Sequence, residues 1–370
     1  MGMENKINLF KVHMPESVLE PLKQVLFSGY IGQGIKVEEF ERILGEYIGN
    51  KLVLTLNSCT SAIQLALRLC NIGVGDEVIS TAMTCTATNE PILAMGAKIV
   101  WADIDPTTGN IDPKSIEKKI TNKTKAIIVV HWGGYPPDLK EINEIAKQHH
   151  LKVIEDAAHA FGAEYQGLKV GNHSDFVCFS FQAIKHITTI DGGALFCKSK
   201  EDYTRGKLLR WYGINREEKG RVDFRQETDV KEFGYKFHMN DVCATIGIEQ
   251  MKYIEGILTE NRNNARILNE SLKSNSEVEL LDYKSDRVSA YWLYSIRVKN
   301  LTRFIAKLNE RGIIVSQVHA RNDKHTMFND FQCELPNVDK FTSQMICIPS
   351  GWWLTKSELV RIIETINQGW

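Results

Sequence analysis

The sequence lacks an excess of charge of one sign, and it lacks any long hydrophobic run. Its 370 residues carry 45 Lys and Arg against 46 Asp and Glu, so the net charge of −1 provides no global field that would attract nucleic acid. No stretch approaches the roughly 18 apolar residues that span a bilayer, and the first residues contain no signal-peptide core. These absences predict a cytoplasmic protein with no nucleic-acid and no membrane partner.

Cysteine pairs of the C-x-x-C type are also missing. The eight cysteines are scattered, and several lie in apolar runs such as 176–179, which is typical of reduced thiols in a protein core. The chain has no G-x-G-x-x-G after its first strand, no G-x-x-x-x-G-K-[ST], no H-E-x-x-H and no G-x-S-x-G. Simple dinucleotide, ATP, zinc-protease and esterase sites are therefore disfavoured, and we expect no metal.

Length and composition indicate two folded domains. At roughly 150 residues per domain the chain is long enough for two, and its 43% hydrophobic and 25% charged residues are ordinary globular proportions. Between residues 53 and 198 short apolar runs alternate with amphipathic stretches, which predicts an α/β fold with a mostly parallel sheet. We expect strands at 53–56, 77–80, 98–101, 126–130, 152–155, 176–179 and 193–196, with helices such as 60–71 and 139–150 between them.

The pattern changes after about residue 200. Residues 214–232 are charged without a clear period, which suggests a surface loop that contacts another subunit. Further on, the sequence predicts helices at 250–274, 301–310 and 356–367 and strands at 291–298 and 313–315. We therefore divide the chain into a large domain, residues 1–250, and a smaller α/β domain, residues 251–370.

Three polar features follow predicted strands at their carboxyl ends, where open parallel sheets bind ligands. Residues 57–61 open a helix whose free N–H groups and hydroxyls favour a phosphate, although Ser and Thr there can equally be simple N-caps. Asp156 precedes an apolar stretch, so this carboxylate either caps a helix or needs a cationic or donating partner. Lys185 lies between two apolar strands, where enclosure lowers the pKa of an amine and suits it to Schiff-base chemistry.

Together the three features match one cofactor. Pyridoxal 5′-phosphate needs a phosphate site, an acid for its pyridine nitrogen and a lysine for its aldehyde. Lys185 would hold the cofactor and shuttle protons, while Asp156 would keep the ring nitrogen protonated. The sequence therefore predicts a pyridoxal-phosphate enzyme.

Longer segments resemble the DegT/DnrJ/EryC1/StrS family, fold-type I pyridoxal-phosphate aminotransferases that act on nucleotide-linked keto-sugars. The similarity covers nearly the whole chain and includes VIEDAAHAFGA (153–163), SFQAIKHITTIDGGAL (180–195) and GYKFHMNDVCATIGIEQM (234–251). The resemblance implies a large domain with a mostly parallel seven-stranded sheet between helices and a smaller C-terminal α/β domain. It also implies a homodimer whose active sites are shared at the interface, with the 234–241 loop reaching into the other subunit's site.

The resemblance implies roles for single residues. Lys185 would carry the cofactor, Asp156 would pair with the pyridine nitrogen, and His159 would lie near the phenolic oxygen of the ring. The residues that would hold the phosphate are Cys59, Thr60 and Ser180.

Three positions depart from the family pattern. Cys85 stands where an aromatic ring commonly stacks on the cofactor, and Lys236 stands where an asparagine commonly reaches the neighbour's phosphate. After His319, the expected substrate-binding residue, Ala320 and Arg321 replace a common aromatic residue in a segment that can border the substrate.

The resemblance favours transamination over the dehydration that some members perform. Those dehydratases have histidine in place of the lysine, whereas here Lys185 fills that position and His186 is its neighbour. The stretch KHITTIDGG is closer to the pattern of C4-aminating members, so we expect amino transfer from L-glutamate or glutamine to a nucleotide-linked 4-keto-6-deoxyhexose. The alternatives are another ketone, namely a 3-keto-sugar, a cyclitol or a small phosphorylated ketone, or a non-catalytic sensor that keeps the fold.

Overall fold

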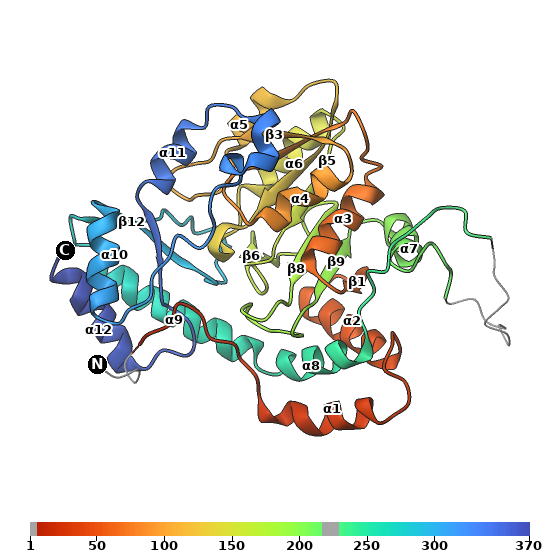
Figure 1. Ribbon diagram of the computed structural model, residues 1–370, viewed down its shortest axis with the longest axis horizontal. Helices are drawn as coiled ribbons and strands as arrows, with labels where there is room; N and C mark the ends of the chain where they lie inside the picture. The colour runs from red at the N-terminus through yellow and green to blue at the C-terminus, as the bar shows by residue number, and fades with distance from the viewer. Residues whose placement is uncertain (1–5, 217–228) are drawn as a thin grey trace.

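The computed structural model describes residues 6–216 and 229–370, and a seven-stranded sheet forms its centre (Figure 1). The strand order is β1-β9-β8-β5-β4-β2-β3, in which β9 runs antiparallel to its two neighbours and all other neighbours are parallel. The strands are β1 (Val53–Leu56), β2 (Glu77–Thr81), β3 (Lys98–Ala102), β4 (Thr124–Val130), β5 (Lys152–Asp156), β8 (Phe176–Ser180) and β9 (Gly193–Cys197). The mostly parallel sheet and all of its strands are confirmed close to the predicted positions.

The central sheet is buried on both faces, which explains the consecutive Val and Ile residues in its strands. Alternate side chains of β5 point to opposite sides, so that Ile154 packs with α3 (Cys59–Leu69) and Val153 packs with α6 (Leu139–Gln148). Helices α2 (Ile35–Ile48) and α8 (Asp241–Met251) cover the same side as α6 near β1 and β9. The carboxyl ends of the parallel strands are left open between these layers.

A second, three-stranded sheet lies in the C-terminal part of the chain. Its order is β10-β12-β13, and its apolar face packs against the long helix α9 and against α10 and α12, which lie together at one end of the molecule (Figure 1). The bounds are β10 (Val278–Leu280), β12 (Tyr294–Val298), β13 (Met345–Ile348), α9 (Ile254–Leu272), α10 (Leu301–Glu310) and α12 (Lys356–Asn367). The predicted helices 301–310 and 356–367 are confirmed residue for residue.

Other predictions for this part need correction. The helix expected at 250–274 is interrupted, because α8 ends at Met251 and α9 starts only at Ile254. The strand expected at 291–298 starts at Tyr294. Residues 313–315 form no strand, since among the described residues Ile313 makes a single bridge, to Ile7 of the N-terminal arm (residues 6–15). Strand β13 was missed because a four-residue apolar run does not distinguish a strand from a helix.

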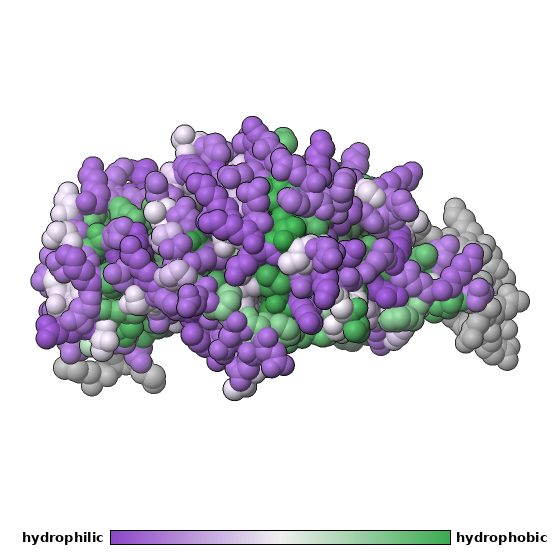
Figure 2. Space-filling view, turned by 90° about the horizontal axis from the view of Figure 1, so that it is seen from above, coloured by the Kyte–Doolittle hydropathy of each residue, from purple (hydrophilic) through white to green (hydrophobic). Residues whose placement is uncertain are grey.

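The remaining α-helices and strands are short. They are α1 (Leu19–Leu26), α4 (Thr86–Ala94), α5 (Pro113–Lys119), α7 (Lys200–Leu209), α11 (Pro336–Thr342), β6 (Glu164–Tyr165), β7 (Leu168–Lys169) and β11 (Arg287–Val288). Of the loop predicted at 214–232, residues 217–228 lie outside the described part of the chain. Hydrophilic side chains cover most of the face shown in Figure 2, and none of the described helices is both long and apolar enough for a bilayer crossing.

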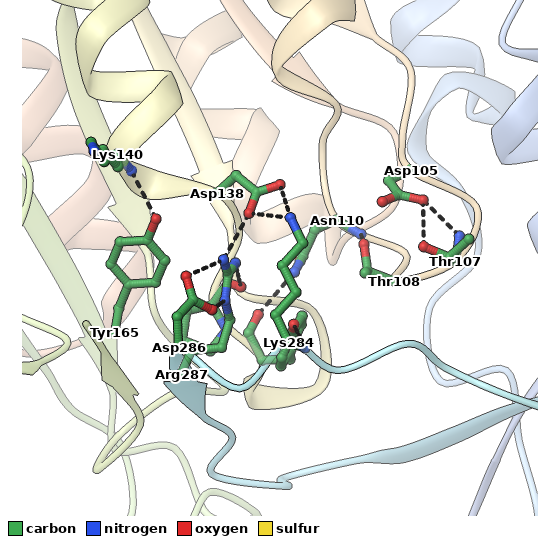
Figure 3. A network of polar contacts seen from close by, with 12 residues as sticks. Asp105, Thr107, Thr108, Asn110, Asp138, Lys140, Tyr165, Lys284, Asp286 and Arg287 are labelled. Carbon is green, nitrogen blue, oxygen red and sulfur yellow. Dashed lines mark hydrogen bonds and ion pairs between the residues drawn. The ribbon is translucent and has the colours of Figure 1, made fainter. Parts of the chain in front are cut away.

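A polar network fastens the segment before β12 to the large domain (Figure 3). Asp138 accepts hydrogen bonds from Lys284 Nζ at 2.8 Å and from Arg287 Nη2 at 2.8 Å. Burial alone would raise the pKa of Asp138, but these two cations outweigh it and hold the pKa below its usual range. Strand β11 adds to β6, so this segment is anchored to the large domain by backbone pairing as well.

Candidate active site

A cavity of about 410 Å³ opens at the carboxyl ends of the parallel strands. Both domains contribute to its wall, and it gathers nearly all of the residues that the sequence singled out: Cys59, Thr60, Cys85, Asp156, His159, Ser180, Lys185 and His319. A larger open cleft of about 680 Å³ beside α6 contains none of these residues. The cavity is therefore the candidate active site.

The start of α3 forms one wall of the cavity and has the features of a phosphate cradle. Ser58 caps the helix by accepting a hydrogen bond from Ser61 N at 3.0 Å, while the N–H groups of Cys59 and Thr60 have no acceptor among the described residues. A Cβ at Gly193 would lie 2.5 Å from Cys59 N, so only glycine lets β9 pass this close to the helix start. Free N–H groups at a helix N-terminus suit an anion, and here they lie beside the hydroxyls of Thr60 and Ser180.

Asp156 ends β5 as a buried carboxylate with neutral donors only. Thr88 Oγ1 donates to Asp156 Oδ2 at 2.6 Å, Ala158 N donates to Oδ1 at 3.1 Å, and Cys59 Sγ lies 3.9 Å from Oδ1. No helix starts at this point, so the alternative of a helix cap is excluded. Within the described residues no cation pairs with Asp156, and a protonated ring nitrogen would supply the partner that a buried carboxylate requires.

Lys185 lies in the loop between β8 and β9, and its amine faces the same cavity. The loop is held by Lys185 N, which donates to Gln182 O at 2.9 Å, and by Thr189 N, which donates to Phe181 O at 2.9 Å. Burial lowers the pKa of Lys185 to about 8, so a substantial fraction of the amine is neutral near physiological pH. A neutral amine is the form that attacks an aldehyde and accepts a proton.

Two neutral histidines complete the polar wall. His159 and His319 stack with ring centroids 5.7 Å apart, and each has one buried ring nitrogen without a partner, Nδ1 and Nε2 respectively. Burial lowers the pKa of His319 to about 4 and that of His159 well below its usual value, so both rings are uncharged at neutral pH. His186, by contrast, is turned away from the cavity, and its Nε2 lies 2.9 Å from Ala290 O.

Lys236 is the one predicted site residue that does not line this cavity. Its side chain is exposed, and its backbone carbonyl accepts a hydrogen bond from Asn57 Nδ2 at 3.3 Å, next to the phosphate cradle. Conversely, the cavity includes Thr88, Trp292 and Phe10, for which the sequence predicted no role. Thr88 follows Thr84 at helical spacing, which could have signalled a shared face, whereas no sequence signal placed Trp292 or Phe10.

Comparison with known proteins identifies the family to which this site belongs. The model of the DegT/DnrJ/EryC1/StrS aminotransferase family matches residues 13–367. The chain belongs to this family. Its pyridoxal-phosphate-dependent aminotransferase activity and its fold-type I architecture, as predicted, are thereby confirmed.

Relatives of known sequence align over nearly the full length. The uncharacterized protein MJ1066 of Methanocaldococcus jannaschii is 34% identical, with 100% of this chain and 98% of the relative covered. A UDP-4-amino-4,6-dideoxy-N-acetyl-beta-L-altrosamine transaminase of Campylobacter jejuni is 31% identical over 97% of this chain and 98% of its own. A UDP-4-amino-4-deoxy-L-arabinose–oxoglutarate aminotransferase of Shewanella sediminis is 31% identical over 95% of both chains.

Solved structures of the family superpose closely. AtS13 from Actinomadura melliaura has a TM-score of 0.96 and 39% identity, with 100% of both chains covered. Spr1654 from Streptococcus pneumoniae, in its PLP-form, has a TM-score of 0.91 and 27% identity over 98% of both chains. The same protein has also been solved in PMP- and apo-forms. The residues described above fit the cofactor: an anion cradle, a buried acid without a cation and an amine of lowered pKa share one cavity.

The close approach of β9 to α3 is directly testable. Gly193→Ala is expected to lower the free energy of unfolding by about 1–3 kcal/mol and to weaken retention of pyridoxal phosphate, because the added methyl group collides with the cradle backbone. Urea denaturation and dialysis of the loaded protein measure the two effects.

Gly256→Ala is the matched control, because a Cβ at Gly256, within α9, meets nothing within 4 Å. This variant is expected to be more stable by roughly 0.5–1 kcal/mol and to retain the cofactor. A Gly193→Ala protein as stable and as well loaded as the control would contradict the role given to Gly193.

Proposed function

We propose that this aminotransferase moves an amino group from L-glutamate to a nucleotide-linked keto-sugar, at C4 of a 4-keto-6-deoxyhexose. The Campylobacter and Shewanella relatives are both named for UDP-linked 4-amino sugars, and the Shewanella name includes oxoglutarate, the keto acid of glutamate. The observation that carries the proposal is the convergence of Asp156, Lys185 and the cradle of α3 in one cavity. A non-catalytic sensor would need neither a lysine of lowered pKa nor a buried, unpaired acid.

Each side chain has a defined task in this proposal. Bound pyridoxal phosphate supplies an electron sink that eases removal of a proton from the carbon bearing the amine. Lys185 binds the cofactor and, when released, accepts and returns that proton at Nζ, for which its pKa of about 8 is well matched. Asp156, fixed by Thr88 and Ala158, holds a proton on the ring nitrogen through its charge.

The remaining residues hold and orient the bound molecules. The N–H groups of Cys59 and Thr60 and the hydroxyl of Ser180 would receive the phosphate, and Cys85 would border the ring. His159 would face the phenolic oxygen and His319 the sugar, and each ring has a buried nitrogen without a partner among the described residues. Neutral imidazoles can hydrogen-bond to hydroxyl groups without repelling the cationic amine beside them.

We infer that the active enzyme is a homodimer, because the cavity of one chain is short of positive charge. Lys185 is the only Lys or Arg among the described residues that line it, whereas the cofactor phosphate and the substrate diphosphate are both anionic. Lys236 of the partner subunit would provide a further cation. The 234–241 loop, which carries Lys236, is hydrogen-bonded to the segment between α1 and α2. Asp241 N donates to Gly32 O at 2.8 Å, and Gly34 N donates to Asp241 Oδ1 at 2.8 Å.

The same segment carries an exposed apolar surface, which extends over residues 27–35 from the end of α1 to the start of α2. Phe27 is 84% exposed, Tyr30 83% and Ile35 74%, although large apolar side chains rarely gather in water unless a partner covers them. Burial of this patch in a dimer would place the 234–241 loop at the interface.

The catalytic assignment predicts the behaviour of two variants. Lys185→Ala is expected to lose at least about 10²-fold in turnover, because the proton carrier is gone, and Asp156→Asn about 10–100-fold, because a charged hydrogen bond is lost. The assay measures 2-oxoglutarate released from L-glutamate with a UDP-linked 4-keto-6-deoxyhexose as acceptor.

Lys147→Ala, which changes an exposed lysine of α6, is the control and should retain full turnover. Unimpaired release by the Lys185→Ala protein would refute the assignment. Replacement of the acceptor by a 3-keto-sugar, a cyclitol ketone or a small phosphorylated ketone tests the substrate, and a higher kcat/KM with any of these would contradict the 4-keto proposal.

The dimer proposal is tested by a charge placed in the apolar surface. Phe27→Glu is expected to convert a dimer to a monomer in light scattering and to reduce turnover, because the buried charge would cost several kcal/mol. Val74→Glu is the matched control, since Val74 is 92% exposed and lies outside the 27–35 surface. A wild-type monomer with full activity, or a Phe27→Glu variant that stays dimeric, would contradict the proposal.

A further inference from the structure

Trp292 lines the cavity and has two aromatic neighbours. The Phe10 ring stacks on its indole with centroids 5.0 Å apart and an interplanar angle of 23°. His159 stacks on it with centroids 4.0 Å apart and an angle of 22°. Trp292 is only 7% exposed, so contacts of this kind cover most of its surface.

The same tryptophan contacts Lys185 in two ways. The amine nitrogen of Lys185 lies 3.5 Å from the ring centroid, and the indole N–H donates to the carbonyl oxygen of Ile184 at 2.8 Å. No ion pair joins Lys185 to Asp156, whose oxygens are engaged by Thr88 and Ala158. The described residues offer the amine no hydrogen bond or ion pair, and the indole face lies directly beside it.

Backbone hydrogen bonds also fix the segment that carries the indole. Its neighbours in sequence are tied to the large domain, since Ala290 N donates to Gly134 O at 3.0 Å and Leu293 N donates to Gly133 O at 3.1 Å. A Cβ at Gly134 would lie 2.6 Å from His159 O, so glycine is required for this close approach. The Asp138 network anchors the segment further upstream (Figure 3). The ring therefore has a fixed position relative to the β8–β9 loop.

We propose that Trp292 is a positioning residue for Lys185. The indole face of Trp292 holds the amine in place and excludes water from it whenever the lysine is not bonded to the cofactor. This inference deepens the proposed function and rests on the role assigned there to Lys185. The contact with the indole face would return the amine to the same position in each catalytic cycle. The hydrogen bond to Ile184 would keep the loop that carries Lys185 in place.

Two effects of the ring on the amine oppose each other. The negative face of the indole attracts an ammonium group, whereas the exclusion of water favours the neutral amine. Burial is the largest influence on Lys185, and it lowers the pKa to about 8 from an ordinary 10.5. Asp156, Cys59 and Cys85 also face the amine and act in the opposite direction, since they raise its pKa. They stay in place when the ring is removed, whereas water gains access, so the pKa should rise.

Competitive labelling of the full-length, cofactor-free protein tests the proposal without any assay of activity. Trace acetic anhydride at a series of pH values, followed by mass spectrometry of the Lys185 peptide, reports the pKa of this amine. In Trp292→Leu the pKa is expected to move from about 8 toward 10.5, so that labelling at pH 7 falls about tenfold or more. A folded Trp292→Leu protein whose Lys185 pKa is unchanged or lower would overturn the proposal.

Trp370→Leu is the matched control, because the Trp370 indole N–H also donates to a backbone carbonyl, that of Lys299 at 2.7 Å, far from the cavity. Its Lys185 labelling should equal that of the wild type.

A second measurement applies if Trp292→Leu does not fold. Tryptophan fluorescence of the wild type should then show a step near pH 8 that Lys185→Met lacks, and the same step in both proteins would overturn the proposal. Because neither measurement involves the cofactor, a failed catalytic role for Lys185 would appear separately, as turnover by Lys185→Ala.

Discussion

The site depends on one electrostatic constraint: a carboxylate and an amine share a buried cavity without pairing with each other. Asp156 is satisfied by a hydroxyl and a backbone N–H, and Lys185 rests over an indole ring. Had the two formed an ion pair, each would have neutralised the other, and neither would be available to a third group. The separation leaves room for a molecule that needs an anion at one end and an amine at the other.

The fold enforces this separation through rigid elements. Asp156 is the last residue of a central strand, while Lys185 lies on a loop between β8 and β9 that Trp292 holds from the side. Gly193 brings the start of β9 against the start of α3 and so places the phosphate cradle at the same edge of the sheet. Three positions distant in sequence are thereby fixed around one cavity, by a strand end, a helix start and a loop held by hydrogen bonds.

Most of the fold and the chemical core of the site could be predicted from the sequence, because consecutive Val and Ile residues mark doubly buried strands and polar residues directly follow them. The contacts of Trp292 and Phe10 could not, since they depend on how a C-terminal segment and the N-terminal arm pack on the large domain. Local pattern likewise failed at residues 313–315, because pairing with a distant segment decides whether a strand forms there. Among the described residues Ile313 makes a single bridge, to Ile7. The place of Lys236 in the assembly stays a prediction, because one chain leaves its side chain exposed outside the cavity.

In the proposed function, Lys185 and Asp156 bind a pyridoxal phosphate that accepts an amino group from L-glutamate. The most direct test is the visible absorption spectrum of the purified protein with added cofactor, recorded before and after L-glutamate, for the wild type and for Lys185→Ala. We expect a visible band of lysine-bound cofactor in the wild type alone, which glutamate bleaches toward the spectrum of pyridoxamine phosphate. A band of equal strength in Lys185→Ala, or a wild-type band that glutamate leaves unchanged, would contradict the proposed function.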